Sequence, residues 1–255
     1  MIAYNGADKD FSLEGKVAII TGGAAGIGYA TGEFFAKKGV KLILADLNPD
    51  TDKIAKGIGS ENIGVVGNIC SSDYIKSVVE KGVAAFGGID ILVNSAGVAF
   101  LDSAESLSEE AWDKTIDINL KASFMMAQAF ANYLIENKRP GSIVNIASQA
   151  GVVALDKHVA YCASKGAIIT MTKVLALEWG KYGIRTNAIS PTVVLTELGR
   201  RAWDNPAGEA HKNEIPAGRF AEPDEIAGTI AFLCSGAAAM INGHNLVIDG
   251  GFTIR

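Results

Sequence analysis

The stretch that decides the fold is Val17–Gly28, which reads VAIITGGAAGIG. It begins with four apolar residues and runs directly into a turn that contains four glycines. A short strand that is apolar at every position is typical of a parallel sheet covered by helices on both faces. The turn leads into a helix that closes near Gly39. The stretch therefore predicts a strand–turn–helix unit of an α/β fold.

The glycine-rich turn has the spacing of a phosphate-binding loop. Gly22 and Gly26 would let the backbone approach a pyrophosphate at the helix N-terminus, where free N–H groups and the helix dipole favour anions. Gly28 would allow close packing of helix on strand. Glycines also serve ordinary turns, but their place between a strand and a helix favours a dinucleotide cofactor.

The next apolar strand, residues 41–45, ends at Asp46, about twenty residues after the glycines. A carboxylate there accepts hydrogen bonds from both hydroxyls of an adenosine ribose and repels a 2′-phosphate. No arginine or lysine stands in the turn at 23–25 or just after Asp46. The sequence therefore favours NAD over NADP, with the alternative that Asp46 only caps the following turn.

The rest of the chain alternates strands with helices. Further strands are expected at residues 63–67, 89–93, 142–146, 185–189 and 246–248, and further helices at residues 71–86, 108–137, 161–179 and 223–233. Because the connections are long enough to cross over, about seven parallel strands should form a doubly wound, Rossmann-type α/β sheet. We predict one domain over residues 1–255, with a polar and aromatic segment at about 195–215 as a lid over the substrate.

Tyr161 and Lys165 lie four residues apart near the start of a predicted helix, and so on one face of it. An ammonium near a phenol favours the phenolate, which could serve as a general base. Most such pairs are an amphipathic aromatic beside a solvated lysine, so the pair alone is weak. Ser148 follows a strand, at the sheet edge where α/β folds bind ligands. Asn119, in an apolar helix stripe, is a satisfied core group, a local kink or a holder of water.

Composition disfavours several classes of function. The 255 residues carry a net charge of −5 without a basic stripe, which disfavours nucleic acid as a partner. Three scattered cysteines, Cys70, Cys162 and Cys234, each in apolar surroundings, fit neither a disulfide framework nor a metal site. The charged stretch at 1–16 and the lack of a long apolar run disfavour a signal peptide and a membrane helix. We expect a cytoplasmic protein without a bound metal.

Taken together, these positions resemble the short-chain dehydrogenase/reductase family. The matches follow the family's order along nearly the whole chain: Thr21-Gly22-x-x-x-Gly26-x-Gly28, Asn94-x-Ala96-Gly97, Asn119, Ser148, Tyr161-x-x-x-Lys165 and Asp249-Gly250-Gly251. The chain departs at Asn68-Ile69, where relatives often have Asp-Val, and at Pro191-Thr192, where many have Pro-Gly. The second departure looks like the version found in xylulose reductases and related polyol dehydrogenases.

The resemblance implies a role for each catalytic position. Tyr161 would move the proton of the substrate hydroxyl as acid or base. Lys165 would lower the pKa of Tyr161, aided by the positive cofactor ring, and hold the nicotinamide ribose. Ser148 would hydrogen-bond the substrate oxygen, and Asn119 would anchor a water leading from Lys165 to solvent.

The resemblance also implies where NAD and the substrate lie. The cofactor would be held by Gly22, Gly26, Ile27, Gly28, Asp46, Asn68, Ile69, Asn94, Ala96, Gly97, Tyr161, Lys165, Pro191, Val194 and Thr196. The substrate pocket would be formed by Ser148, Gln149, Val152, His158, Tyr161, Thr192 and residues 198–203. Gln149 and His158 suit the extra hydroxyls of a small polyol better than an acyl chain. His158 could equally be an exposed loop residue, and His211 and His244 are expected to be ordinary.

The leading hypothesis is an NAD-dependent oxidoreductase that converts a pentitol, tetritol or hexitol into a ketose, or the reverse. One alternative is a reductase of a 3-oxoacyl thioester or small ketone. Another is a non-catalytic dinucleotide-binding regulator, against which the intact Ser148, Tyr161 and Lys165 argue. The family commonly forms tetramers through the helices that carry Asn119 and Tyr161, so a homotetramer is expected, and residues 254–255 could reach a neighbouring subunit.

Overall fold

The structure is a computed structural model that describes residue 8 and residues 11–255. Residues 1–7 and 9–10, on which the argument about a signal peptide partly depends, lie outside the described residues. Within the described part of the chain, seven strands form one parallel sheet in the order β3-β2-β1-β4-β5-β6-β7. The strands are β1 (Val17–Thr21), β2 (Lys41–Asp46), β3 (Ile63–Val66), β4 (Ile91–Asn94), β5 (Gly141–Ile146), β6 (Ile184–Pro191) and β7 (Asn245–Ile248). The predicted doubly wound, single-domain α/β fold is confirmed.

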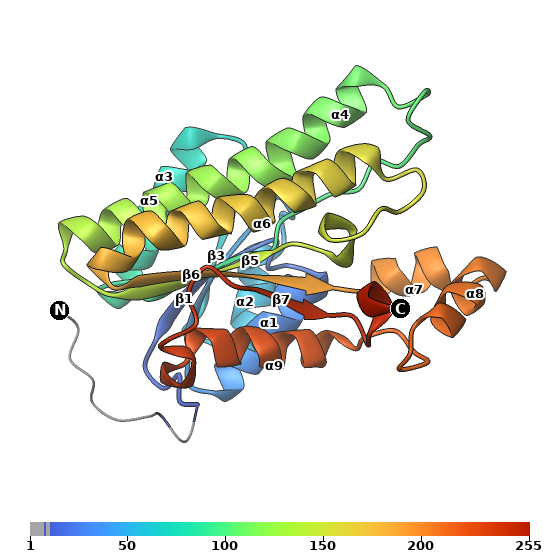
Figure 1. Cartoon of the computed structure of the whole chain (residues 1–255). Helices are drawn as coiled ribbons and strands as arrows, with labels where there is room; N and C mark the ends of the chain where they lie inside the picture. The colour runs from blue at the N-terminus through green and yellow to red at the C-terminus, as the bar shows by residue number, and fades with distance from the viewer. Residues whose placement is uncertain (1–7, 9–10) are drawn as a thin grey trace.

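Helices cover both faces of the sheet, as Figure 1 shows. They are α1 (Gly26–Lys37), α2 (Thr51–Ile58), α3 (Ser72–Phe86), α4 (Glu109–Ile116), α5 (Ala122–Glu136), α6 (Val159–Trp179), α7 (Glu197–Trp203), α8 (Pro206–Glu214) and α9 (Pro223–Cys234). Side chains of a strand alternate between faces, so Ile20 packs in the core cluster with Phe35 of α1 and Ile230 of α9. Ile19 packs in the other cluster, with Phe130 of α5. This two-sided burial explains why β1 is apolar throughout.

The strand order reverses direction at β1. Its last residue, Thr21, pairs with Ala45 of β2 on one side and with Asn94 of β4 on the other. Connections after β1 and β4 therefore leave in opposite directions, which opens a crevice at the carboxyl ends of these strands. The fold thus places the glycine turn, Asp46 and residues 94–97 around one switch point.

The long helix expected at 108–137 is interrupted. A π-helical turn at Asp117–Lys121 separates α4 from α5, and Asn119 lies in it. Such turns widen the helix locally and often occur at functional sites. The chain leaves the helical conformation after Glu136.

The expected lid folds into two short helices rather than an irregular segment. Thr196 accepts a hydrogen bond from Gly199 N–H at 3.1 Å and so caps α7, while Asn205 caps α8 and Pro206 stands at its first position. Helices this short depend on capping and tertiary packing rather than on a periodic apolar stripe. That is why periodicity did not reveal them.

One expectation about the cysteines is wrong. Cys70 is exposed, because it follows Asn68 in the tight turn before α3, whereas Cys162 and Cys234 are partly buried. In the described part of the chain, no helix has the length and apolar character needed to cross a membrane. Among residues 8 and 11–255, no group of three or more His, Cys, Asp and Glu side chains is arranged to hold a metal ion.

Candidate active site

The glycine turn after β1 has the backbone conformation that its composition predicts. Gly22 and Gly26 have φ values of 63° and 58°, which L side chains rarely adopt. A Cβ atom on Gly22 would lie 2.9 Å from the Cα of Ala96, so the turn touches the chain after β4. α1 then starts at Gly26 with no side-chain cap among the described residues. Its first N–H groups suit the pyrophosphate of a dinucleotide.

Asp46 lies against this turn. Its Oδ2 accepts a hydrogen bond from Ala24 N–H and its Oδ1 one from Asn48 N–H, each at 3.0 Å. The carboxylate therefore caps its own turn and also faces the glycine loop, so the two interpretations of Asp46 are compatible. This chain's residues fit an adenosine ribose at this point.

The neighbouring strand ends use their polar groups within the protein. Asn94 is buried, and its Nδ2 donates to Ser123 O at 3.0 Å and to Asn145 Oδ1 at 2.9 Å. Its amide hydrogens therefore join β4 with β5 and α5, while its buried Oδ1 has no hydrogen-bond partner among the described residues. Asn68 is exposed and accepts a hydrogen bond from Cys70 N–H, while Ile69 packs against the core.

On the far side of the crevice, β6 leads toward the lid. Pro191 ends β6, and Val194 is buried and forms an isolated bridge with Ala221. A Cβ atom on Gly26 would lie 3.6 Å from Cγ2 of Thr196. Thr196, the N-cap of α7, thus lies beside the glycine turn although the two are 170 positions apart in the sequence.

Tyr161 and Ser148 meet across the turn that follows β5. The 3₁₀ turn Gln149–Gly151 packs on α6 so tightly that a Cβ atom on Gly151 would lie 2.7 Å from the carbonyl carbon of Lys165. Burial raises the pKa of the Tyr161 phenol, and a hydrogen bond from the Ser148 hydroxyl acts in the opposite direction. Sequence reasoning did not single out Gly151, because the backbone that it touches is distant in the sequence.

Lys165 is buried beneath Tyr161. Its Nζ donates to Ile146 O at 2.7 Å and lies 5.6 Å from the Tyr161 ring centroid. Burial lowers the pKa of Lys165 to about 8. A Cβ atom on Gly97 would lie 3.3 Å from Oδ1 of Asn119 and 3.6 Å from Nζ of Lys165, so the chain after β4 lies directly against both side chains.

The pKa of Tyr161 in the protein alone moves opposite to the expected direction. The sequence predicted that Lys165 lowers it, whereas desolvation of the phenol is the largest effect and raises it. The reason is that helix packing buries both groups, and burial disfavours both charged forms. The positive ring of an oxidised nicotinamide, which the family resemblance implies, would favour the phenolate when the cofactor is bound.

Asn119 is both a satisfied core group and part of a helix distortion. Its Oδ1 accepts from Val98 N–H at 2.8 Å, and its Nδ2 donates to Val98 O at 2.9 Å and to Ser164 Oγ at 3.1 Å. Ser164 Oγ in turn donates to Tyr161 O at 2.8 Å. Asn119 thereby fixes the chain after β4 to the first turn of α6.

Two of the predicted substrate residues, His158 and Gln149, lie near Tyr161 and Ser148, and the other two are placed differently. The ring of His158 lies edge-on to that of Tyr161 at 6.1 Å between centroids, and Gln149 is buried next to Ser148. Val152, by contrast, is among the exposed apolar residues. Thr192 lines a separate hollow of about 110 Å³, together with residues from the segment 217–225 and with Ile248 and Gly250 at the end of β7.

His211 was expected to be ordinary, yet α8 brings it to the site. Its Nε2 lies 3.5 Å from Nε2 of Gln149, and its ring stacks on Trp203 at 5.0 Å between centroids. No local signal in the sequence could reveal this contact, because it joins residues 62 positions apart.

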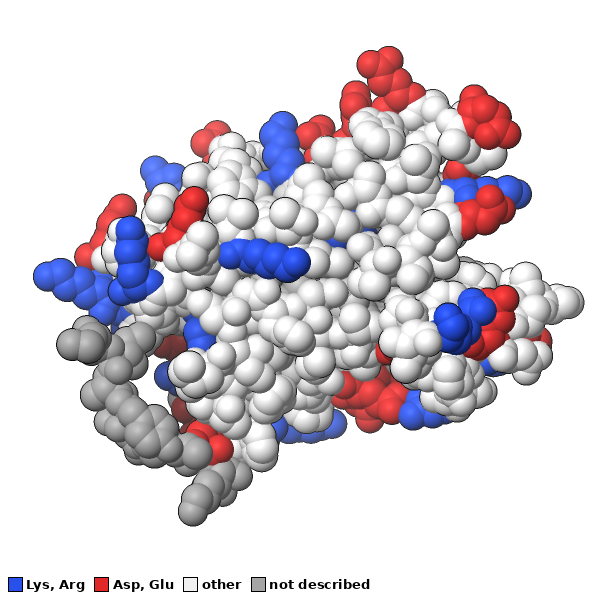
Figure 2. All heavy atoms as spheres, viewed as in Figure 1, with Lys and Arg blue, Asp and Glu red and all other residues white. Residues whose placement is uncertain are grey.

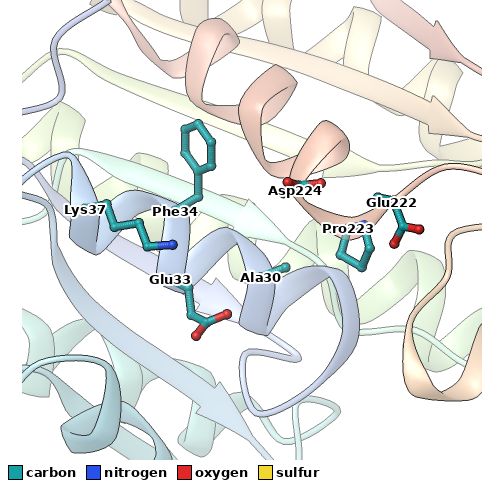
Figure 3. Close-up of a pocket in the computed structure, with 7 residues that line it drawn as sticks. All are labelled: Ala30, Glu33, Phe34, Lys37, Glu222, Pro223 and Asp224. Atoms are coloured by element: carbon teal, nitrogen blue, oxygen red, sulfur yellow. The ribbon is translucent and has the colours of Figure 1, made fainter.

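A larger surface hollow of about 420 Å³ lies elsewhere, between α1 and the start of α9. Figure 3 shows the residues that line it: Ala30, Glu33, Phe34, Lys37, Glu222, Pro223 and Asp224. Three carboxylates face one lysine there, which is unfavourable for an anionic dinucleotide. Its lining shares no residue with the predicted site.

The arrangement can bind a dinucleotide along the glycine turn and transfer a proton at Tyr161. Ser148 and Tyr161 can both hydrogen-bond one substrate oxygen. Lys165 lies buried beneath them and can carry a positive charge. Such an arrangement can move the proton of a substrate hydroxyl while a bound nicotinamide accepts the hydride.

Comparison with known proteins agrees with this chemistry. Residues 22–253 match a family model described as enoyl-(acyl carrier protein) reductase. The chain is 51% identical, over the full length of both proteins, to an NAD-dependent glycerol dehydrogenase of Listeria innocua. It is 52% identical to a D-threitol dehydrogenase of Mycolicibacterium smegmatis, covering 97% of this chain and 96% of that one. A short-chain type dehydrogenase/reductase from Mycobacterium marinum has a similar crystal structure, with a TM-score of 0.90, 30% identity and coverage of 96% and 98%.

Proposed function

The chain belongs to the short-chain dehydrogenase/reductase family, and on that basis we propose that it is an NAD-dependent dehydrogenase of small polyols. It would oxidise a secondary hydroxyl of a triol, tetritol, pentitol or hexitol to the ketone, or catalyse the reverse reaction. The observation that carries this proposal is the polar surroundings of Tyr161, where Gln149 and His158 can meet extra hydroxyls. The two relatives at 51% and 52% identity, named for glycerol and D-threitol, support it.

The cofactor would be held by the residues described above, with Asp46 at the adenosine ribose and Thr196 and Val194 near the nicotinamide. Bound NAD supplies the acceptor for the hydride that leaves the substrate carbon. The phenolate of Tyr161 takes the hydroxyl proton as the carbonyl forms. Ser148 holds the same oxygen, and Lys165 stabilises the phenolate by its charge.

NAD is preferred because Asp46 faces the glycine turn. Its carboxylate accepts two backbone hydrogen bonds and presents negative charge where NADP carries its 2′-phosphate. The name of the Listeria innocua relative agrees with this preference.

A second candidate is reduction of an acyl thioester, which the description of the matching family model favours. A long acyl chain would need an apolar channel, whereas the buried Gln149 that follows Ser148 is polar and contacts the imidazole of His211. Both candidates make the protein an enzyme and leave no support for a purely regulatory role.

One assay separates the two candidates. The purified protein is given NAD with glycerol, D-threitol, xylitol and sorbitol, and NADH or NADPH with acetoacetyl thioesters, and the nicotinamide absorbance is followed. We expect NADH to form with at least one polyol. Turnover of thioesters alone would reject the polyol proposal.

We also propose that residues 195–215 act as a substrate lid. The core cluster of Ile215, Phe220 and Phe252 packs with Trp203 of α7 and with Val153 and Leu155 after β5. The lid helices therefore rest on the segment between Ser148 and Tyr161. Their closure over a substrate would exclude water from the site.

A homotetramer in the cytoplasm completes the proposal. Figure 2 shows that the face carrying α6 and α9 is mostly uncharged. Val174 and Leu177 of α6 are 46% and 82% exposed, which favours burial against another subunit. Three free cysteines are compatible with a reducing compartment. Sedimentation or light scattering in solution would test the assembly.

A further inference from the structure

The side-chain amide of Gln149 contacts His211 through its nitrogen, while its oxygen has no hydrogen-bond partner among the described residues. Gln149 is 3% exposed and directly follows Ser148. Its Nε2 contacts His211 Nε2 at 3.5 Å, while its buried Oε1 has no hydrogen-bond partner among the described residues. Buried carbonyl oxygens are nearly always paired. Oε1 of Gln149 is therefore available to accept a hydrogen bond from a ligand.

The ring of His211 is fixed in place by aromatic neighbours. It stacks on Trp203 at 5.0 Å and lies 4.8 Å from Phe252 and 6.0 Å from Phe220, measured between ring centroids. The His211 side chain is only 12% exposed. Its two ring nitrogens therefore point to defined partners.

Those partners determine which nitrogen carries the proton. Nδ1 lies 3.3 Å from Glu214 Oε2, and the same oxygen accepts a hydrogen bond from Arg255 Nη2 at 2.9 Å. A carboxylate paired with a guanidinium is ionised and can only accept, so the His211 proton resides on Nδ1. In the neutral ring Nε2 is then an acceptor, and Gln149 must donate to it through its own Nε2.

We propose that His211, backed by Glu214 and Arg255, is a positioning residue that turns the Gln149 carbonyl oxygen toward the substrate. There Oε1 accepts a hydrogen bond from a polyol hydroxyl other than the one oxidised. The inference rests on the proposed function and deepens it, because it assigns the contact that would distinguish a polyol from its deoxy analogue. A site built to bond a hydroxyl discriminates against a molecule that lacks it.

The test compares matched substrates in the full-length protein. Glycerol is paired with 1,2-propanediol, and D-threitol with 2,3-butanediol, so that each partner lacks hydroxyls but keeps a secondary alcohol. His211→Phe keeps an aromatic ring and removes the acceptor for Gln149. We expect it to raise the KM of glycerol and D-threitol roughly fivefold, with kcat changed less than about twofold, and to spare the deoxy partners.

Further variants distinguish positioning from simple damage. His211→Gln restores an acceptor and should recover part of the lost selectivity. The double variant His211→Phe with Gln149→Met should be no worse than Gln149→Met alone, because both act through one contact. Glu80→Gln, which breaks an exposed ion pair with Lys76 on α3, outside the proposed lid, is the control and should leave both KM values unchanged.

Each possible result either supports or overturns the positioning role given to His211. Equal changes for polyols and deoxy partners, or none in His211→Phe, would overturn it while the proposed function stands. A parent protein that oxidises no polyol would overturn both, and that result is visible before any variant is made. If His211→Phe does not fold, as judged by NADH binding, Glu214→Gln takes its place, with a smaller effect expected in the same direction.

Discussion

Tyr161 and Lys165 are held in a site that disfavours both of their charged forms. Burial raises the pKa of Tyr161 and lowers that of Lys165 to about 8. Alcohol oxidation needs the deprotonated phenol. Its kcat/KM should therefore rise with pH and level off once Tyr161 has lost its proton, while ketone reduction, which needs the protonated phenol, should fall across the same range.

Lys165→Met should shift this pH dependence. Without the ammonium the phenolate is less stable, so the pKa of Tyr161 rises and the rising limb for oxidation moves to higher pH. At pH 7 we expect oxidation to slow by roughly 10²-fold or more. Steady-state rates over a pH series measure the shift, with Lys165→Arg as the charge-preserving comparison. An unmoved profile in Lys165→Met would refute the role given to Lys165.

Asp46 is expected to set the choice of cofactor. Asp46→Ser removes two charged acceptors from the ribose and the repulsion toward a 2′-phosphate. The kcat/KM with NAD should fall by roughly tenfold, and that with NADP should rise. Measurement with both cofactors checks the change in their ratio. A parent protein that works equally well with NADP would contradict this account of the carboxylate.

The 3₁₀ turn after β5 positions Ser148 because Gly151 lets it touch α6. Gly151→Ala would place a methyl group 2.7 Å and 2.8 Å from the backbone C and O of Lys165, so turn and helix must separate. Displacement of Ser148 relative to Tyr161 should lower kcat by roughly tenfold to a hundredfold. NADH affinity, for which the glycine turn and Asp46 would supply contacts outside this turn, should change less than kcat.

Gly57→Ala is the matched control for that variant. Gly57 lies in α2, and a Cβ atom there would meet nothing within 4 Å. Alanine should leave kcat unchanged and stabilise the helix by about 0.4–1 kcal/mol. If Gly151→Ala behaved like Gly57→Ala in both kcat and thermal stability, the turn would not position Ser148.

The elements that sequence predicts best are those whose cause is local. Strands such as β1 are apolar at each position because both faces are buried, and the capped start of α3 follows from Ser71, which accepts a hydrogen bond from Tyr74 N–H. A local kink at Asn119 was one of three alternatives from the sequence, and the sequence could not select it, because the π turn accompanies bonds to Val98 and Ser164 that are distant in the sequence.

For the whole molecule, the sequence predicted the doubly wound parallel sheet, but neither its strand order nor the direction of individual side chains. Asp46 lies at the glycine turn as expected. The amide of Asn94, by contrast, is committed to Asn145, 51 positions away, and His211 reaches Gln149 only because α8 packs beside the turn after β5. Such contacts depend on tertiary packing, which neither composition nor periodicity encodes.

The central claim is that Tyr161 transfers the proton when a small polyol is oxidised by NAD. The most direct measurement is the rate of NADH formation from glycerol and D-threitol by the parent protein and by Tyr161→Phe, with NADH binding measured for both. We predict turnover by the parent and a loss of at least about 10²-fold in kcat for Tyr161→Phe, with cofactor affinity kept. A parent that oxidises neither polyol, or a Tyr161→Phe variant that keeps the full rate, would contradict the account.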